Sequence, residues 1–286
     1  MGNKKITLID GAIGTYLTKK GYKGLTPELA CIERDDLVEE IHTEYVESGA
    51  EIILTNTFGA NKARLSKKKL EDKHQIINEK SIEIATKVKN KKNILVAGDI
   101  GPTGELLYPY GNIKQEECEE IFLSQAKFFI GKVDIIVLET FTDLSELEIA
   151  YSILKKNFQI TIIPCLSFQI GKEYRTVMGN TIEDYISWTR NIEVKIIGIN
   201  CGVGSEQMKE IVKKIYSLTE KSLWVKPNAG IPKLLHGEVI YPENKEEFVE
   251  NCLFMCKNFP VEFIGGCCGT DPSYIKHLKE KINEYN

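Results

Sequence analysis

The chain has 286 residues, of which 42% are hydrophobic and 27% are charged, and its formal net charge is −4 at pH 7. This composition is ordinary for a globular protein, and scattered lysines on an acidic chain give no electrostatic footprint for nucleic acid. No apolar window is long enough to cross a bilayer, and the N-terminus has no signal-peptide pattern, so we expect a cytoplasmic protein without a membrane partner. Eight cysteines in such a protein indicate metal or catalytic duties for some of them.

Short runs rich in Ile and Val recur along the chain, and each is followed by an amphipathic segment. Because the runs are apolar throughout, without strong alternation, they predict parallel strands that are buried on both faces. In chain order these runs are 6–9, 51–55, 94–98, 134–138, 160–165, 195–199, 223–226 and 262–264.

Helix-start signals stand between the runs. Pro27, after Thr26, suits the first turn of a helix. Asp143, with Glu146 three residues later, has the arrangement of a capping box, and Asp271 precedes the last helical pattern.

Eight strand–helix units without a Pro/Gly/Ser-rich linker predict an α/β fold, a single (β/α)8 TIM barrel that forms one domain over residues 1–286. The alternative is an open doubly wound sheet. That sheet would have two edge strands, which should be more polar than any of these runs.

Five of the cysteines lie in apolar contexts. Cys252 and Cys256 have helical i, i+4 spacing and could bind a metal, but packing on an apolar helix face is the favoured interpretation, because free cysteine behaves as a small hydrophobe. We interpret Cys31, Cys118 and Cys165 in the same way.

The other three cysteines follow predicted strands. Cys267 and Cys268 lie in a glycine-flanked turn after the last run, and Cys201 follows the sixth. The carboxyl ends of barrel strands share one rim, so the three thiols can face one point. Three thiolates leave a tetrahedral Zn²⁺ with one open position, which is typical of a catalytic site. The alternative is that Cys267 and Cys268 are merely small residues in a tight turn.

Such a zinc ion would favour sulfur chemistry. Zinc coordination deprotonates a thiol whose free pKa is about 8.5, and three anionic ligands keep an incoming thiolate nucleophilic. The expected reaction is therefore alkylation of a substrate sulfur at a methyl carbon.

Seven strand-end motifs together resemble the homocysteine S-methyltransferase family, and the resemblance covers nearly the whole chain. The motifs are DGAIGT at 10–15, TNTF at 55–58, GDIGPTG at 98–104, ETF at 139–141, GINC at 198–201, PNAG at 227–230 and GGCCGT at 265–270. The resemblance implies a (β/α)8 barrel and the formation of methionine from homocysteine. The stretch 99–106 is more similar to the homocysteine-binding module of cobalamin-dependent methionine synthase than to betaine- or S-methylmethionine-dependent enzymes.

The resemblance also implies roles for individual residues. It places one Zn²⁺ on Cys201, Cys267 and Cys268, and the homocysteine sulfur supplies the fourth ligand. The remaining predicted residues meet the substrate or the metal's surroundings: backbone N–H groups of the turn at Asp10, Gly11 and Ala12 bind the carboxylate, Glu139 binds the ammonium group, Asn200 orients the metal site, and Asn228 occupies the fourth metal position when substrate is absent. Asp10 could instead cap its turn, and Asn200 could satisfy strand-end backbone groups.

The methyl donor is less defined. A corrinoid-binding pattern Asp-x-His-x-x-Gly is incomplete at Asp72, because Ile77 replaces the glycine. We therefore expect that this chain does not bind cobalamin and that a separate corrinoid- or folate-binding partner protein presents methylcobalamin. The alternatives are S-methylmethionine or another small sulfonium or betaine donor, and a non-catalytic homocysteine-binding protein.

Overall fold

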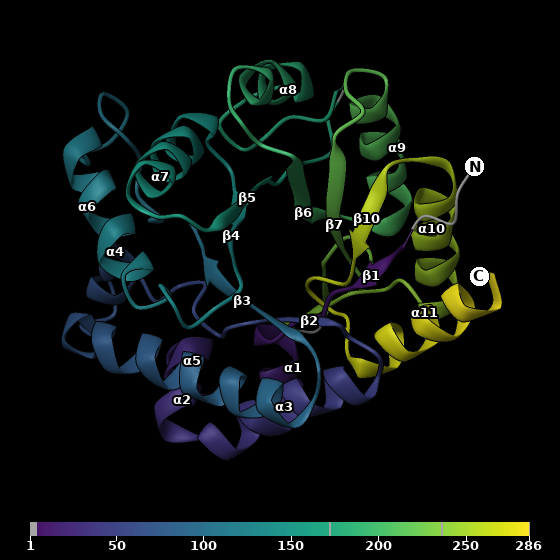
Figure 1. The fold of residues 1–286 in the computed structure, drawn as a ribbon, viewed down its shortest axis with the longest axis horizontal. Coiled ribbons are helices and arrows are strands. Elements are labelled where there is room, and N and C mark those ends of the chain that lie inside the picture. The colour runs from purple at the N-terminus through teal and green to yellow at the C-terminus, as the bar shows by residue number, and fades with distance from the viewer. Residues whose placement is uncertain (1–4, 172, 236, 286) are drawn as a thin grey trace.

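The computed structural model describes residues 5–171, 173–235 and 237–285, and eight of its strands form one parallel sheet that helices surround (Figure 1). These strands are β1 (Thr7–Leu8), β2 (Ile52–Leu54), β3 (Leu95–Ile100), β4 (Ile135–Phe141), β5 (Thr161–Leu166), β6 (Ile196–Gly204), β7 (Ser222–Asn228) and β10 (Val261–Ile264). Each predicted run coincides with one of them, so all eight strand predictions are confirmed.

The sheet curls into a barrel. Its strand order is β1-β10-β7-β6-β5-β4-β3-β2, and a parallel bridge between Ile9 and Ile52 joins the two ends. Two backbone hydrogen bonds support this joint, from Asp10 N to Ile52 O at 2.9 Å and from Glu51 N to Leu8 O at 2.8 Å. The eight-stranded barrel is thus confirmed, and a single bridge pairs β1 with β2 where the barrel closes.

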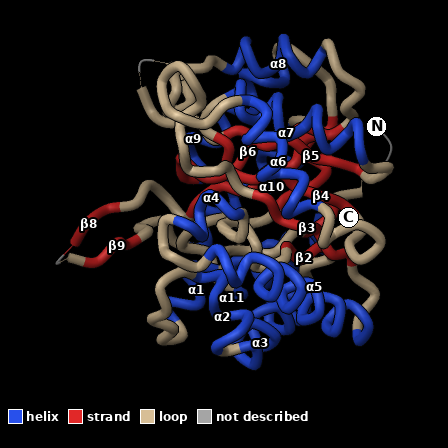
Figure 2. Tube along the Cα trace, turned by 90° about the vertical axis from the view of Figure 1, so that its left-hand side faces the viewer, coloured by secondary structure: helices blue, strands red, loops and turns tan. Residues whose placement is uncertain are grey.

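Helices follow the strands and cover the outside of the barrel (Figures 1 and 2). They are α1 (Gly14–Lys19), η1 (Pro27–Leu29), α2 (Ala30–Glu33), α3 (Asp35–Glu47), α4 (Lys62–Ser66), η2 (Glu71–Lys73), α5 (His74–Lys91), α6 (Gln115–Ala126), α7 (Leu144–Asn157), α8 (Ile182–Arg190), α9 (Ser205–Tyr216), α10 (Lys245–Asn258) and α11 (Pro272–Tyr285). Within the described ranges, no helix combines the length and apolar character that crossing a bilayer requires.

All three helix-start signals stand at the start of a helix, but one predicted motif is wrong. Pro27 opens η1, and the Asp271 carboxylate accepts a hydrogen bond from Ser273 N at the start of α11. Asp143 caps α7 through Ser145 N, but the predicted capping box is wrong. Glu146 turns instead to the loop after β3, where it accepts hydrogen bonds from Thr103 N at 2.7 Å and Thr103 Oγ1 at 2.6 Å. A buried neighbouring loop offers this carboxylate better donors than its own helix end.

The apolar core has two layers, one inside the barrel and one between strands and helices. The interior layer contains Ile9, Ile52, Leu54, Ala97, Val137, Ile163, Cys165 and Trp224. Cys31, Cys118, Cys252 and Cys256 are buried in the outer layer. The interpretation of these five cysteines as packing residues is confirmed by their burial.

Alternation along the strands determines which polar residues enter the barrel mouth. In β4, Ile135 and Val137 belong to the interior layer, and Glu139 follows on the same side two residues later. In β7, Trp224 is interior, and Lys226 and Asn228 continue that side. Polar side chains at the carboxyl ends of the strands therefore sit above an apolar barrel interior.

A short antiparallel hairpin, which the sequence pattern did not predict, extends from the segment after β7. It consists of β8 (Lys233–Leu235) and β9 (Glu238–Ile240), and it projects away from the barrel (Figure 2). Both strands are exposed, and Leu234 is 76% exposed. The hairpin leads directly into Tyr241, which returns the chain to the barrel rim.

Candidate metal centre

Three thiols from two distant parts of the chain converge at the barrel rim. The sulfur atoms of Cys201, Cys267 and Cys268 all lie within 4.8 Å of one another. Tetrahedral zinc with Zn–S bonds of about 2.3 Å needs sulfur atoms about 3.8 Å apart. The donor set and its spacing therefore fit a zinc ion with three cysteine ligands, as the sequence predicts.

An irregular end of β6 aims Cys201 at this point. The strand continues past its predicted end, and its register with β7 shifts between Asn200 and Gly204. Cys201 has a φ of 58°, and Gly202 has a φ of 74°. Since the left-handed region is unfavourable for a residue with a Cβ, surrounding contacts must hold Cys201 there.

Asn200 supplies one such contact. It reaches β4, where its Oδ1 accepts from Thr140 N at 2.9 Å and its Nδ2 donates to Thr140 Oγ1 at 2.6 Å. Thr140 also has a positive φ, of 57°. Asn200 Nδ2 lies 3.9 Å from the Cys267 sulfur as well. Asn200 thus ties two irregular strand ends together beside the thiols.

The turn that carries Cys267 and Cys268 is held from both sides. Cys267 N donates to Pro227 O at 2.7 Å, and Ala229 N donates to Cys268 O at 2.9 Å. Between these two anchors lies Asn228, the last residue of β7, which is 2% exposed and whose Oδ1 has no hydrogen-bond partner in the described part of the chain. A buried amide oxygen without a partner is suited to a cation or a donor group.

The three thiols do not share protons equally. Hydrogen bonds from Cys201 and Cys267, together with one from the Tyr241 hydroxyl, lower the pKa of Cys268 to about 3. Hydrogen bonding to Cys267 and then to Cys268 raises the pKa of Cys201. Hydrogen bonds within the cluster thus stabilise a thiolate among the three sulfurs. Tyr241 was not predicted as a site residue, because nothing in the local sequence places the end of the hairpin against this turn.

A cavity of about 470 Å³ opens beside the thiols within the barrel mouth. Of the predicted site residues, Gly11, Ala12, Glu139 and the three cysteines line it. Asp10, Asn200 and Asn228 lie just behind this wall and are buried. The structure therefore brings all nine predicted residues to one end of the barrel, and their roles toward a substrate stay predictions.

Ionisable groups meet at the floor of the cavity. Lys226 Nζ lies 3.0 Å from Asp10 Oδ1 and 3.4 Å from Glu139 Oε1. Burial raises the pKa of Glu139 to about 7, against the opposing charge of Lys226. Burial and then the charge of Glu139 raise the pKa of Asp99 well above its usual range. Lys226 was missed as a site residue, although its alternation with Trp224 and Asn228 is a signal that could have identified it.

The turn at Gly11 and Ala12 packs against the turn that carries Cys267 and Cys268. Ala12 N donates to Thr270 Oγ1 at 3.2 Å, and Thr270 Oγ1 donates to Cys267 O at 2.8 Å. A Cβ on Gly11 would lie 2.7 Å from the Tyr45 hydroxyl oxygen, so only glycine fits at this position. Thr270 therefore couples the predicted carboxylate-binding turn to the turn that carries Cys267 and Cys268.

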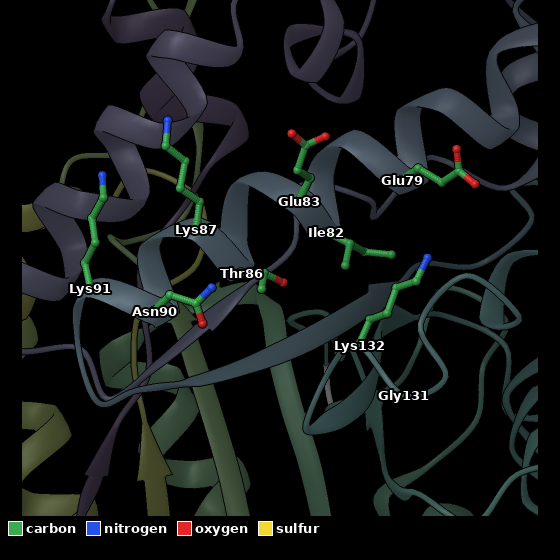
Figure 3. Close-up of a pocket in the computed structure, with 9 residues that line it drawn as sticks. All are labelled: Glu79, Ile82, Glu83, Thr86, Lys87, Asn90, Lys91, Gly131 and Lys132. Carbon is green, nitrogen blue, oxygen red and sulfur yellow. The ribbon is translucent and has the colours of Figure 1, made fainter.

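A second hollow lies on the outside of the barrel, along α5 (Figure 3). It is lined by Glu79, Glu83, Lys87 and Lys91 together with part of the turn before β4. Glu39 on α3 already pairs with both Lys87 and Lys91. This groove is remote from the thiols and has compensated charges, so the chemistry of the molecule concentrates at the cysteine cavity.

Comparisons with known proteins identify the family of this chain. The sequence profile of the family described as "Homocysteine S-methyltransferase" matches residues 7–282. A methionine synthase from Mycobacterium leprae is 27% identical over 301 aligned positions, which cover 99% of this chain and 25% of that protein. The chain thus spans about a quarter of the length of that relative.

Solved structures share the fold. The metallated form of the homocysteine methyltransferase MmuM from Escherichia coli matches with a TM-score of 0.80 at 22% identity, over 98% of this chain and 97% of that one. The carboxyl transferase domain of Rhizobium etli pyruvate carboxylase matches with a TM-score of 0.55 at 11% identity, over 99% and 48%. Such likeness establishes the barrel, whereas the profile match over almost the whole sequence establishes the relationship. The chain belongs to the homocysteine S-methyltransferase family.

Proposed function

We propose that this protein methylates the sulfur of homocysteine to form methionine, with Zn²⁺ held by Cys201, Cys267 and Cys268 and with the methyl group delivered by methylcobalamin on a separate protein. The observation that carries the proposal is the convergence of three thiols, within 4.8 Å of one another, on the wall of a cavity of about 470 Å³. Membership of the family supplies the substrate.

When bound, zinc keeps a coordinated substrate thiol deprotonated near neutral pH. The protein's own groups bring that sulfur into position. Asn200 braces the irregular ends of β4 and β6, and Thr270 braces the Cys267–Cys268 turn. Asn228, whose Oδ1 has no partner among the described residues, is suited to fill the fourth metal position before substrate arrives.

The amino acid end of homocysteine would lie on the other side of the cavity. Glu139 lines that side, and its carboxylate can accept charge-assisted hydrogen bonds from the ammonium group. The turn at Asp10, Gly11 and Ala12 would receive the carboxylate through backbone N–H groups. Two anchors at the polar end and one at the sulfur would fix the substrate for an in-line reaction.

In the transfer step, the substrate thiolate attacks the methyl carbon. A sulfur–carbon bond forms while the bond between the methyl carbon and its carrier breaks, and the bonding electron pair stays with the carrier. No proton moves on the protein. The chain has to hold the nucleophile in line with the methyl carbon and the carrier.

One similarity supports a corrinoid donor. The motif at 99–106 is more similar to that of the cobalamin-dependent methionine synthase module than to those of betaine- or S-methylmethionine-dependent enzymes. S-Methylmethionine or another small sulfonium or betaine donor is the second candidate, because the cavity is large enough to admit a small molecule beside homocysteine.

The deciding experiment uses zinc-loaded protein with homocysteine and, separately, methylcobalamin, S-methylmethionine or betaine, with methionine as the readout. Formation with methylcobalamin supports the proposal. Formation with a small donor alone overturns the corrinoid assignment while keeping the chemistry. Zinc-dependent homocysteine binding without methionine from any donor would favour a non-catalytic homocysteine-binding protein.

A further inference from the structure

A buried ammonium group, that of Lys226, lies among acidic groups at the floor of the cavity. Its side chain is only 4% exposed. Of the described residues that line the cavity, Lys226 carries the only positive charge, whereas Glu28, Asp99 and Glu139 bring carboxyl groups and three cysteines bring thiols. A charge at this depth is stable only when it is paired. Its partners therefore indicate what it does.

Asp10 forms a hydrogen-bonded ion pair with Lys226. The Asp10 side chain is completely buried, its Oδ1 accepts from Lys226 Nζ at 3.0 Å, and its Oδ2 accepts from Leu54 N at 2.7 Å. Both carboxylate oxygens are thus engaged within the protein. The ion pair connects β7 to the site where β1 and β2 meet, and it fixes the position of the Lys226 ammonium group.

Glu139 forms a longer ion pair with Lys226. Its Oε1 lies 3.4 Å from Lys226 Nζ, beyond the usual length of a strong hydrogen bond, and makes no hydrogen bond within the described part of the chain. The same side chain lines the cavity. Lys226 therefore attracts and orients the Glu139 carboxylate without consuming its hydrogen-bonding capacity.

From this geometry we infer that Lys226 is a positioning residue that makes the cavity selective for thiols with an α-amino group. Asp10 holds Lys226, Lys226 holds the Glu139 carboxylate at the cavity wall, and Glu139 accepts the ammonium group of the substrate. The inference rests on the proposed function, and it deepens that function by naming the chemical class of thiol that the site accepts.

Removing the ammonium charge should loosen this arrangement. Glu139 would face Asp10 and the thiols without an opposing charge, and like charges at short range repel strongly in a buried site. The carboxylate would then turn away or take up a proton, and either change removes the acceptor for the substrate's ammonium group. A thiol that lacks the amino group has no contact to lose.

The experiment uses cobalt-substituted protein, in which the three cysteine ligands already produce sulfur-to-metal charge-transfer absorption, and a bound substrate thiolate increases it; the increase reports binding without any methyl donor. Three thiols are titrated: homocysteine, 4-mercaptobutanoate, which lacks the amino group, and 3-aminopropanethiol, which lacks the carboxylate. Each is measured with wild-type protein, Lys226→Gln, which can still hydrogen-bond Asp10, and Lys226→Arg, which keeps the charge. Cobalt content and circular dichroism confirm the state of each variant.

The expected result is that Lys226→Gln weakens homocysteine and 3-aminopropanethiol at least about tenfold, as loss of a charge-assisted hydrogen bond implies, and leaves 4-mercaptobutanoate unchanged. Lys226→Arg should recover part of the loss. In a Glu139→Gln background, Lys226→Gln should add little, because the two residues act on one contact.

Other outcomes overturn the inference. Equal weakening of all three thiols means that Lys226 is a structural ion pair. Weakening of homocysteine and 4-mercaptobutanoate, but not of 3-aminopropanethiol, means that Lys226 binds the carboxylate itself. Should Lys226→Gln fail to fold, Lys226→Arg takes its place: it must weaken homocysteine and 3-aminopropanethiol more than 4-mercaptobutanoate, and equal weakening of all three thiols overturns the inference. Absence of any increase in charge-transfer absorption with every thiol, in protein with full cobalt content, refutes the proposed function and, with it, this inference.

Discussion

Replacing Gly266 with alanine should damage the metal site through Thr270. An ideal Cβ at Gly266 would lie 2.4 Å from Thr270 Oγ1, 2.7 Å from its Cγ2 and 2.8 Å from its Cβ. Ordinary contacts between such atoms begin at about 3.5 Å, so Thr270 must move by roughly 1 Å. It cannot move freely, because its Oγ1 bonds both Cys267 O and Ala12 N.

The size of the effect follows from these contacts. Overpacking of this kind costs about 1–3 kcal/mol, and each of the two hydrogen bonds contributes about 1 kcal/mol. We expect the free energy of unfolding to fall by about 3–5 kcal/mol, which corresponds to a decrease in Tm of roughly 6–10 °C in a chain of this size. Since Cys267 moves with Thr270, zinc affinity should fall about 10- to 100-fold.

Thermal unfolding and competition with a chromophoric zinc chelator measure the two quantities. The matched control is Gly14→Ala, whose new Cβ meets Pro27 Cγ at an ordinary 3.4 Å, and which should keep both zinc affinity and Tm. Wild-type zinc affinity in Gly266→Ala would refute the view that the Gly266–Thr270 contact holds the cysteine turn in place.

Three further predictions concern the thiols and their neighbours. Cys268→Ala should lose zinc and methyl transfer while the barrel stays folded, whereas Cys252→Ala, which is buried in α10, should keep one zinc per chain; full zinc content in Cys268→Ala would contradict the ligand assignment. Tyr241→Phe removes a hydrogen bond to the Cys268 sulfur and should weaken zinc binding up to about tenfold without abolishing it, and unchanged affinity in the chelator assay would exclude a role for the hydroxyl. Because burial raises the pKa of Glu139 to about 7, the carboxylate takes up a proton as pH falls through that value, and the preference for homocysteine over 4-mercaptobutanoate should decrease. Glu139→Gln should remove this pH dependence. If the pH dependence persists in the variant, another group is responsible for it.

The same shift has a consequence for stability. The folded-state pKa of Glu139 lies above the unfolded value of about 4.5, so the folded protein holds this proton over a pH range in which the unfolded chain has released it. The contribution of Glu139 to the free energy of unfolding therefore decreases as pH rises from about 4.5 to about 7. Glu139→Gln should flatten that part of the stability profile.

Much of the barrel and of the thiol site could be predicted from local sequence patterns. Runs of Ile and Val identified all eight barrel strands, because burial on both faces leaves a continuous apolar pattern within a few residues. The barrel then brings strand ends that are distant in sequence to one rim, so Cys201 and the Cys267–Cys268 pair could be expected to meet. Each of these steps needs only short-range patterns and one general rule of topology.

Other features depended on contacts that local patterns do not encode. Glu146 has a good capping position, yet it binds Thr103, 43 residues away. The hairpin formed by β8 and β9 brings Tyr241 to Cys268, although its sequence resembles an ordinary exposed loop.

By itself, then, the sequence determined the order of strands and helices, the barrel and the identity of the three thiols, because these follow from periodicity and from residue type. Only the tertiary structure decided the left-handed backbone at Cys201 and the pairing of Lys226 with Asp10, 216 residues earlier in the chain. The physical reason is that a buried charge or a strained backbone is stabilised by the groups that closure of the barrel brings beside it. Which groups these are depends on the whole barrel and not on the local sequence.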